Sequence, residues 1–379
     1  MTIVYCIDSI HGVGGIQHVT LAKASALAET EGNEVWILFA DRSGILRYPV
    51  SSSVHTVDLD INYYADDWKS RWNVLKGLFI KRRLHRKRLA KQLHLIKPDV
   101  VISVGQSEKH FLPFIRGPWV TVREFHFVKN YRIRQANSIF DRLLAWGGNG
   151  LDQFVLRKYD GIVSLTQEDK DNNWNNWSTV RVIPNPVCLS SVSSSLESKR
   201  IMSAGRLDYQ KNYISLIRAF SIIHRSFPEW TLDIYGDGSE SESLSSGIQA
   251  LGLSSSVRLM GIRPDVQGLM PDYSLFALSS RFEGFPLVLV EAISCGLPVV
   301  SYACPCGPKD IIRDGVDGFL VPPGDETMLA ERICQLIEDD DLRKTMGAAA
   351  LERAKAFSIE KIIPQWTSLF EELTKSKKR

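Results

Sequence analysis

Short apolar runs alternate with segments whose apolar residues recur at helical intervals, and this alternation continues through most of the chain. The runs have the length of strands, and most are bounded by glycine, proline or polar residues. They lie at residues 3–7, 34–39, 100–104, 119–123, 159–165, 200–204, 230–235, 257–260, 275–278 and 297–302. Strands that alternate with helices are typical of an α/β protein built on parallel sheets.

The chain has 379 residues, which suits two domains better than a single core. A break in the pattern occurs at residues 181–187, where two prolines and an asparagine interrupt regular structure, and a serine-rich segment follows at 189–199. We therefore predict an N-terminal domain at 1–185 and a C-terminal domain at 186–356. The remaining segment, 357–379, is expected to form a helix that returns to the first domain and a disordered basic tail.

Two glutamates stand close together in the second half, Glu283 in a loop after the strand at 275–278 and Glu291 inside the apolar helix at 287–293. Pro286 lies between them, where a helix commonly begins. Open α/β sheets bind ligands at the carboxyl ends of their strands. A helix N-terminus there attracts phosphate, and carboxylates accept hydrogen bonds from a polyol. The pattern indicates a sugar-nucleotide site; the alternative is two solvated charges.

Two cations follow the strand at 200–204, namely Arg206 and Lys211 in the segment SAGRLDYQKN. They lie beside a predicted helix N-terminus, where a guanidinium and an ammonium group could hold a diphosphate. The alternative is a surface ion pair.

The first half contains a turn with Gly14 and Gly15 between a strand and a helix, which is compatible with phosphate binding. The turn lacks the full dinucleotide fingerprint, so a simple tight turn is the alternative.

The most basic segment is a predicted helix before the strand at 100–104. Its cations alternate with apolar residues such as Leu84, Leu89 and Leu93 at helical spacing. A basic amphipathic helix can lie on an anionic membrane surface. The alternative is a solvated helix face that packs on the sheet through its leucines. The cations assigned to the candidate membrane surface are Lys81, Arg82, Arg83, Arg86, Lys87 and Arg88.

Other sequence features bear on cellular location and on metal binding. The N-terminus lacks the basic region of a signal peptide, and no apolar run has membrane-spanning length, so we expect a cytoplasmic protein. If the basic helix binds lipid, the protein would be peripheral on the inner face of the cell membrane. Scattered cysteines indicate reduced thiols. Asp58 and Asp60 lie far from the glutamate pair, and Cys304 and Cys306 have no second ligand pair, so we predict no metal and no other cofactor.

The stretch at 279–308 resembles the Glu-x7-Glu signature of the retaining nucleotide-sugar glycosyltransferases of family 4, part of the glycosyl transferases group 1. The segments at 203–212 and 307–325 extend the resemblance, which is weaker in the first half. It implies the GT-B fold, α/β with two Rossmann-like, doubly wound parallel-sheet domains facing each other across a cleft.

The resemblance also implies roles for individual residues. Glu283 would contact the hydroxyls of the donor sugar and Glu291 those of the ribose. His126, just after the strand at 119–123, would point into the cleft, where the alternative is an ordinary loop histidine. Arg263 would lie near the base. The implied catalytic residues are Glu283, His126, Arg206 and Lys211. The implied donor-binding residues are Gly14, Gly15, Arg206, Lys211, Arg263, Glu283, Gly284, Phe285, Val288, Leu289 and Glu291.

These implications predict a glycosyltransferase. It would move a hexose or N-acetylhexosamine from a nucleoside diphosphate sugar, expected to be a UDP-sugar, to a hydroxyl of a lipid-linked or polysaccharide acceptor with retention. Cell-surface polysaccharide such as lipopolysaccharide or capsule would be the product. A non-catalytic sugar-nucleotide-binding or scaffold protein of the same fold is the alternative. No aromatic-interleaved recognition motif supports nucleic-acid binding.

Overall fold

The computed structural model describes residues 1–12, 14–63, 71–126 and 150–377. The chain divides into two compact units. Unit 1 comprises Met1–Leu165, Lys170–Pro186 and Ile362–Arg379, and unit 2 comprises Thr166–Asp169 and Val187–Lys361. The division after Pro186 lies one residue from the expected boundary at 185, and the segment from Ile362 onward belongs to unit 1.

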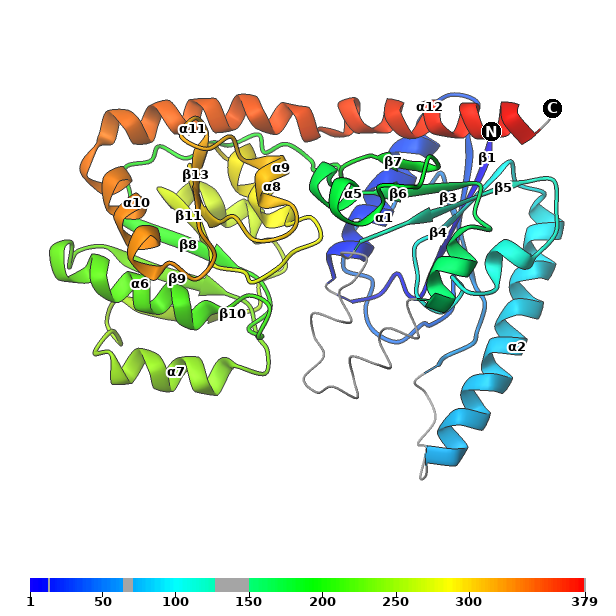
Figure 1. The fold of residues 1–379 in the computed structure, drawn as a ribbon, viewed down its shortest axis with the longest axis horizontal. Coiled ribbons are helices and arrows are strands. Elements are labelled where there is room, and N and C mark those ends of the chain that lie inside the picture. The colour runs from blue at the N-terminus through cyan, green and yellow to red at the C-terminus, as the bar shows by residue number, and fades with distance from the viewer. Residues whose placement is uncertain (13, 64–70, 127–149, 378–379) are drawn as a thin grey trace. The chain divides into compact units, whose positions relative to one another are not determined.

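Unit 1 is built on a seven-stranded sheet with the order β3-β2-β1-β4-β5-β6-β7, in which neighbouring strands pair in parallel (Figure 1). Its strands are β1 (Thr2–Ile7), β2 (Glu34–Phe39), β3 (Val54–Asp58), β4 (Val100–Ser103), β5 (Val120–Glu124), β6 (Gly161–Ser164) and β7 (Val180–Val182). Its helical segments in the described part of the chain include α1 (Gly15–Ala28), α2 (Arg71–Ile96), η1 (Leu112–Phe114) and most of α5 (Gln167–Asn173). Because β1 and β4 are buried on both faces, they are apolar almost throughout.

Unit 2 is built on a second parallel sheet with six strands in the order β10-β9-β8-β11-β12-β13. Its strands are β8 (Arg200–Ala204), β9 (Thr231–Tyr235), β10 (Val257–Gly261), β11 (Leu275–Leu278), β12 (Val299–Tyr302) and β13 (Gly318–Val321). Its helical segments are α6 (Tyr213–Ser226), α7 (Ser241–Ala250), η2 (Gln267–Asp272), α8 (Leu287–Ser294), α9 (Pro308–Ile311), α10 (Glu326–Glu338), α11 (Asp340–Ala354) and η3 (Lys355–Phe357). The prediction of two parallel-sheet α/β domains is confirmed.

The last helix, α12 (Ile359–Lys377), returns the chain to unit 1, where Trp366 and Phe370 are fully buried. The predicted disordered tail is wrong for its first residues, because the helix continues through Lys377. The Lys377 ammonium is held by the carbonyl oxygen of Trp119 and by the Asp160 carboxylate, 3.3 Å away, which favours the helical conformation at this end.

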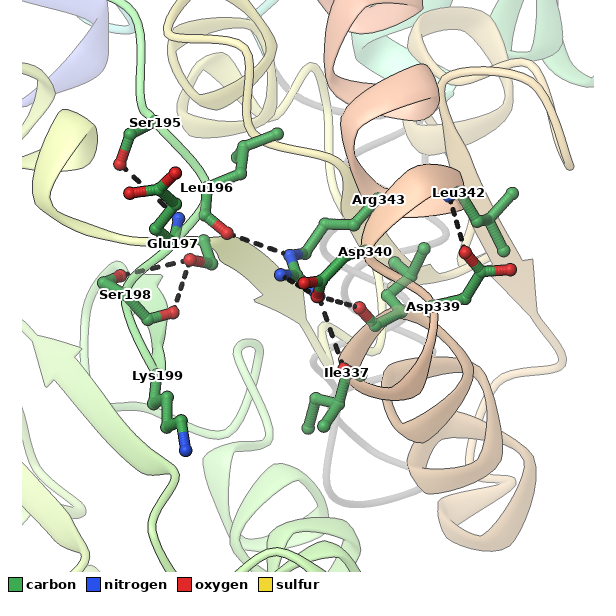
Figure 2. Close-up of polar contacts among 12 residues, drawn as sticks. Ser195, Leu196, Glu197, Ser198, Lys199, Ile337, Asp339, Asp340, Leu342 and Arg343 are labelled. Carbon is green, nitrogen blue, oxygen red and sulfur yellow. Dashed lines mark hydrogen bonds and ion pairs between the residues drawn. The ribbon is translucent and has the colours of Figure 1, made fainter.

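A buried arginine joins the start of unit 2 to its last helices (Figure 2). Arg343 on α11 is only 4% exposed. Its guanidinium donates to the carbonyl oxygens of Leu196, at 3.0 Å, and Leu336, at 2.6 Å, and also to the Asp340 carboxylate. The planar fork of arginine suits this role, because it can satisfy several buried acceptors at once.

We expect Arg343→Met to destabilise unit 2 by about 2–4 kcal/mol, because the apolar side chain leaves buried carbonyl groups without donors. Urea unfolding followed by fluorescence would measure the change. Lys344→Met, at the exposed neighbouring position, is the matched control and should stay within about 0.5 kcal/mol of the parent. Equal stabilities of the two variants would contradict the role given to Arg343.

Candidate functional site

Two loops at the carboxyl edge of the unit 2 sheet carry the centre of the candidate site. Loop 205–212 follows β8 and loop 279–286 follows β11, and these strands are neighbours in the sheet. Parallel strands bring their carboxyl ends to the same edge, so residues far apart in sequence meet there. The first loop ends at α6 and the second at α8.

Lys211 and Glu283 form an ion pair between these loops. The Lys211 ammonium lies 2.7 Å from the Glu283 carboxylate, and the two side chains are only 13% and 7% exposed. An ion pair so far removed from water is retained only with good geometry and additional hydrogen bonds. The structure therefore brings together a predicted phosphate contact and a predicted sugar contact.

Glu283 has two further side-chain partners. The Ser280 hydroxyl donates to it at 2.6 Å and the Gln210 amide at 3.3 Å. Its backbone is also fixed, since its N–H donates to the Pro305 carbonyl at 2.9 Å. Sequence analysis missed Ser280 and Gln210; their positions beside Glu283 and Lys211 in the two motifs were the available signal.

Gly205 gives Lys211 the room to reach Glu283. Its φ of +154° lies outside the ordinary range of other residues, and a Cβ atom at this position would be 2.7 Å from Cε of Lys211. A larger residue would be strained at this φ and would push against the lysine side chain, so glycine leaves the lysine its present position.

Glu291 lies on α8 in a different electrostatic setting. It is half-buried, and no hydrogen bond or ion pair engages its carboxylate among the residues described by the structure. Burial, together with the like charge of Asp265, raises the pKa of Glu291 to about 7, although the Lys211 ammonium opposes the shift. The influence of Lys211 connects Glu291 to the ion pair, and Asp265 is a neighbour that sequence analysis missed.

The remaining cations of unit 2 are less enclosed. Arg206 is 71% exposed, and its guanidinium lies 3.3 Å from the Asp208 carboxylate of the same loop. This contact is the surface ion pair considered as the alternative for Arg206, and such pairs contribute little to stability. Arg263 follows β10 and is also exposed. Their donor-binding roles stay predictions.

The start of α8 agrees with the expected helix. Pro286 is the N-cap residue and the helix begins at Leu287, as the sequence predicted. Phe285 and Leu289 are buried, whereas Gly284 and Val288 are half-buried. Leu289 is fully enclosed, and its contact with a ligand stays a prediction.

The residues predicted in the first half lie in unit 1. Gly14 is the N-cap of α1 and Gly15 is its first residue. A Cβ atom on Gly14 would lie 2.2 Å from the side-chain amide oxygen of Gln17, so the turn is tightly packed. Whether the turn serves phosphate stays a prediction.

The side chain of His126 is almost completely removed from solvent. Its side chain is 4% exposed, and Nε2 lies 3.3 Å from the Glu124 carboxylate, which also pairs with the buried Lys23 ammonium. Burial lowers the pKa of His126 to about 4, although Glu124 opposes the shift. The imidazole is therefore neutral near pH 7, and its catalytic role stays a prediction.

The basic helix α2 has both features that were considered, namely exposed cations and leucines that pack on the sheet. Leu89 and Leu93 are fully buried in the unit 1 core, as a packed helix requires. Arg83, Arg86 and Lys87 are exposed, whereas Lys81 and Arg88 donate to backbone carbonyls. Four large apolar side chains on the described part of the same helix are also exposed, namely Leu78, Phe79, Ile80 and Leu95, at 37%, 63%, 64% and 65%.

In the described ranges no three histidine, cysteine, aspartate or glutamate side chains are grouped closely enough to hold a metal ion. Over the same ranges, no helix has both the length and the apolar character needed to cross a bilayer.

Residues 191–353 match the model of the family described as Glycosyl transferases group 1. These residues lie within unit 2 and include the Lys211–Glu283 pair. Unit 2 is therefore similar to this family of glycosyltransferases over the matched residues.

Three relatives illustrate the wider similarity. An exopolysaccharide phosphotransferase of Streptomyces coelicolor is 29% identical over 95% of this chain and 40% of its own length. An uncharacterized glycosyltransferase of Haemophilus influenzae is 28% identical over 96% of this chain and 98% of its own length. A Campylobacter jejuni enzyme named as an N-acetylgalactosamine-N,N'-diacetylbacillosaminyl-diphospho-undecaprenol 4-alpha-N-acetylgalactosaminyltransferase is 36% identical over 44% of this chain and 45% of its own length. The chain thus spans less than half of two of these relatives.

The fold is that of GT-B proteins. TarM of S. aureus, solved as a mutant in complex with fondaparinux, α-GlcNAc-glycerol and UDP, superposes with a TM-score of 0.78 over 97% of this chain and 99% of its own, at 15% sequence identity. This similarity confirms the predicted GT-B architecture of two Rossmann-like units.

The raised pKa of Glu291 predicts a specific pH dependence of stability. Between the ordinary glutamate pKa and about 7, the folded state keeps a proton that the unfolded state has lost, so stability falls as the pH rises. We expect Glu291→Gln, which cannot ionise, to gain stability relative to the parent from pH 5 to pH 8. Urea unfolding of both proteins at several pH values would measure this, and a pH-independent difference would contradict it.

Proposed function

We propose that this protein is a retaining glycosyltransferase of family 4 that takes a hexosyl or N-acetylhexosaminyl group from a nucleoside diphosphate sugar, with UDP as the expected nucleotide. The observation that carries the proposal is the Lys211–Glu283 pair, supported by Ser280 and Gln210, beside Glu291 at one sheet edge. Cation, carboxylate and amide groups at one place suit a ligand that is both a polyol and a diphosphate.

The charge that develops on the leaving diphosphate explains why a fixed cation would be needed at this site. Negative charge develops on the departing diphosphate as the anomeric bond breaks, and a fixed cation aimed at that charge stabilises the transition state. Lys211 is held by Glu283 and has room because residue 205 is glycine, so its ammonium is preorganised. Arg206 is exposed and could pair with phosphate instead of Asp208. The proposed reaction needs no metal or other cofactor.

Retention requires that the new bond form on the same face as the old one. In the proposed reaction the acceptor hydroxyl attacks the anomeric carbon as the diphosphate leaves, and a phosphate oxygen takes the hydroxyl proton. Glu283 holds the sugar through its hydroxyls and is not the base. His126, neutral near pH 7, supplies a hydrogen-bonding group from unit 1 in this proposal.

For the acceptor we propose a hydroxyl of a lipid-linked or polysaccharide glycan, in the assembly of cell-surface polysaccharide such as lipopolysaccharide or capsule. The names of the Streptomyces and Campylobacter relatives, which refer to exopolysaccharide and to a diphospho-undecaprenol substrate, support this choice. We also propose that the protein is cytoplasmic and binds the inner face of the cell membrane through α2. A non-catalytic sugar-nucleotide-binding protein is the alternative.

The Glu283→Gln variant, compared with the parent, tests whether the protein is a glycosyltransferase or a non-catalytic sugar-nucleotide-binding protein. We expect transfer to fall by about 100-fold or more, because the contact to the sugar loses its charge. UDP affinity should change by less than about threefold or become tighter, since Lys211 is freed from its carboxylate partner. A donor panel assayed by mass spectrometry, with anomeric NMR of the product, measures transfer and tests retention, and calorimetry measures UDP binding. Undiminished transfer would contradict the role of Glu283, and absence of transfer by the parent with intact UDP binding would favour the non-catalytic alternative.

Membrane binding is tested by reversing two exposed cations, Arg86→Glu with Lys87→Glu. Each cation near an anionic surface contributes about 1 kcal/mol, so vesicle binding should fall by about 30-fold or more. Sedimentation with vesicles containing phosphatidylserine measures the effect. Arg225→Glu with Lys344→Glu makes the same charge change at exposed positions of unit 2 and should bind like the parent. Equal binding of both double variants would remove α2 as the contact surface.

A further inference from the structure

Arg281 joins the two loops that carry Lys211 and Glu283, although it lies in neither predicted site. Its backbone N–H donates to the Gln210 carbonyl at 2.8 Å. Its guanidinium Nε donates to the Tyr209 carbonyl at 3.1 Å, and one terminal nitrogen donates to the Asn212 amide oxygen at 2.7 Å. Arg281 therefore makes three hydrogen bonds across the gap between the loops.

The guanidinium also lies over an aromatic ring. Its central carbon is 4.4 Å from the centroid of the Tyr209 ring, a distance at which a cation is attracted to the ring face. Tyr209 is 59% exposed, so this contact is at the surface of the loop. A lysine could reach one of these acceptors but has no planar fork with which to hold both and stack.

Asn212 shows how the contact affects the backbone. It is the N-cap of α6 with a φ of +53°, and its side chain makes no capping hydrogen bond. Asparagine at an N-cap ordinarily accepts from the first turn of its own helix. Here its amide oxygen accepts from Arg281 instead, while the Ser279 hydroxyl donates to the Asn212 carbonyl at 3.1 Å. Asn212 thus braces the loop at the residue next to Lys211.

We propose that Arg281 is a positioning residue that holds the Lys211–Glu283 pair in register without touching substrate. It is bonded to the two neighbours of Lys211, at 210 and 212, and it stands two residues before Glu283. Loss of the brace lets the two loops move separately, and a displacement of about 1 Å at such a site can cost on the order of 100-fold in rate. The catalytic part of this inference rests on the proposed function.

The test compares Arg281→Gln with the conservative Arg281→Lys. Arg225→Gln, at an exposed position of the same unit, is the control. NMR of isotope-labelled lysine ammonium groups, with Lys211 assigned by Lys211→Arg, reports its pairing with Glu283 in the absence of any ligand. We expect the Lys211 signal in Arg281→Gln to move toward its position in Glu283→Gln and kcat to fall by about tenfold or more. Arg281→Lys should recover part of both effects.

Tyr209→Ala is a second variant, in case Arg281→Gln does not fold. It removes the ring but keeps the backbone carbonyl, so the same changes should appear with smaller size. A Lys211 signal that stays at its parent position in the folded variants overturns the inference, even where the melting temperature falls. If the parent shows no UDP binding and no transfer while the signal still moves, the bracing by Arg281 stands and the proposed function fails.

Discussion

The ion pair between Lys211 and Glu283 is the interaction on which the site depends. It joins residues from loops after β8 and β11, and both side chains are largely removed from water. Charges in such a place are stable only when each has partners of opposite charge or good hydrogen-bond geometry. Gly205 leaves space for the lysine, and Ser280 and Gln210 donate hydrogen bonds to the carboxylate. Arg281 connects the two loops, so several neighbouring residues stabilise the pair.

The two glutamates of the same motif occupy different settings, although they are eight positions apart in one continuous segment. Glu283 is enclosed by a cation, a hydroxyl and an amide, whereas the half-buried Glu291 has a like charge nearby and a pKa raised to about 7. The loop conformation before α8 produces this difference, since it directs Glu283 toward loop 205–212 while the helix carries Glu291. A ligand bound there would meet one carboxylate that is paired with the Lys211 ammonium and one carboxylate whose charge depends on pH.

Unit 1 has its own buried polar group, formed by Lys23, Glu124 and His126. The carboxylate contacts both the ammonium and the imidazole, and the Lys23 ammonium also lies 4.4 Å from the centroid of the Trp366 ring on α12. The C-terminal helix therefore contributes to the environment of the strand end that carries His126. Burial of this group keeps the imidazole neutral, which favours hydrogen bonding over electrostatic attraction of phosphate.

The sequence alone determined the α/β class, the break near Pro186, the strands at 34–39, 200–204 and 275–278, and the segments that carry Lys211, Glu283 and Glu291. These features are local, because apolar periodicity, proline and glycine act over a few residues. The tertiary structure decided which side chains meet. It paired Lys211 with Glu283, left Arg206 on the surface and enclosed His126, because strand order and loop packing bring together residues that are distant in sequence. Local patterns mark the segments but do not show which side chains pair, so the contacts of Ser280, Gln210 and Arg281 became known only from the tertiary structure.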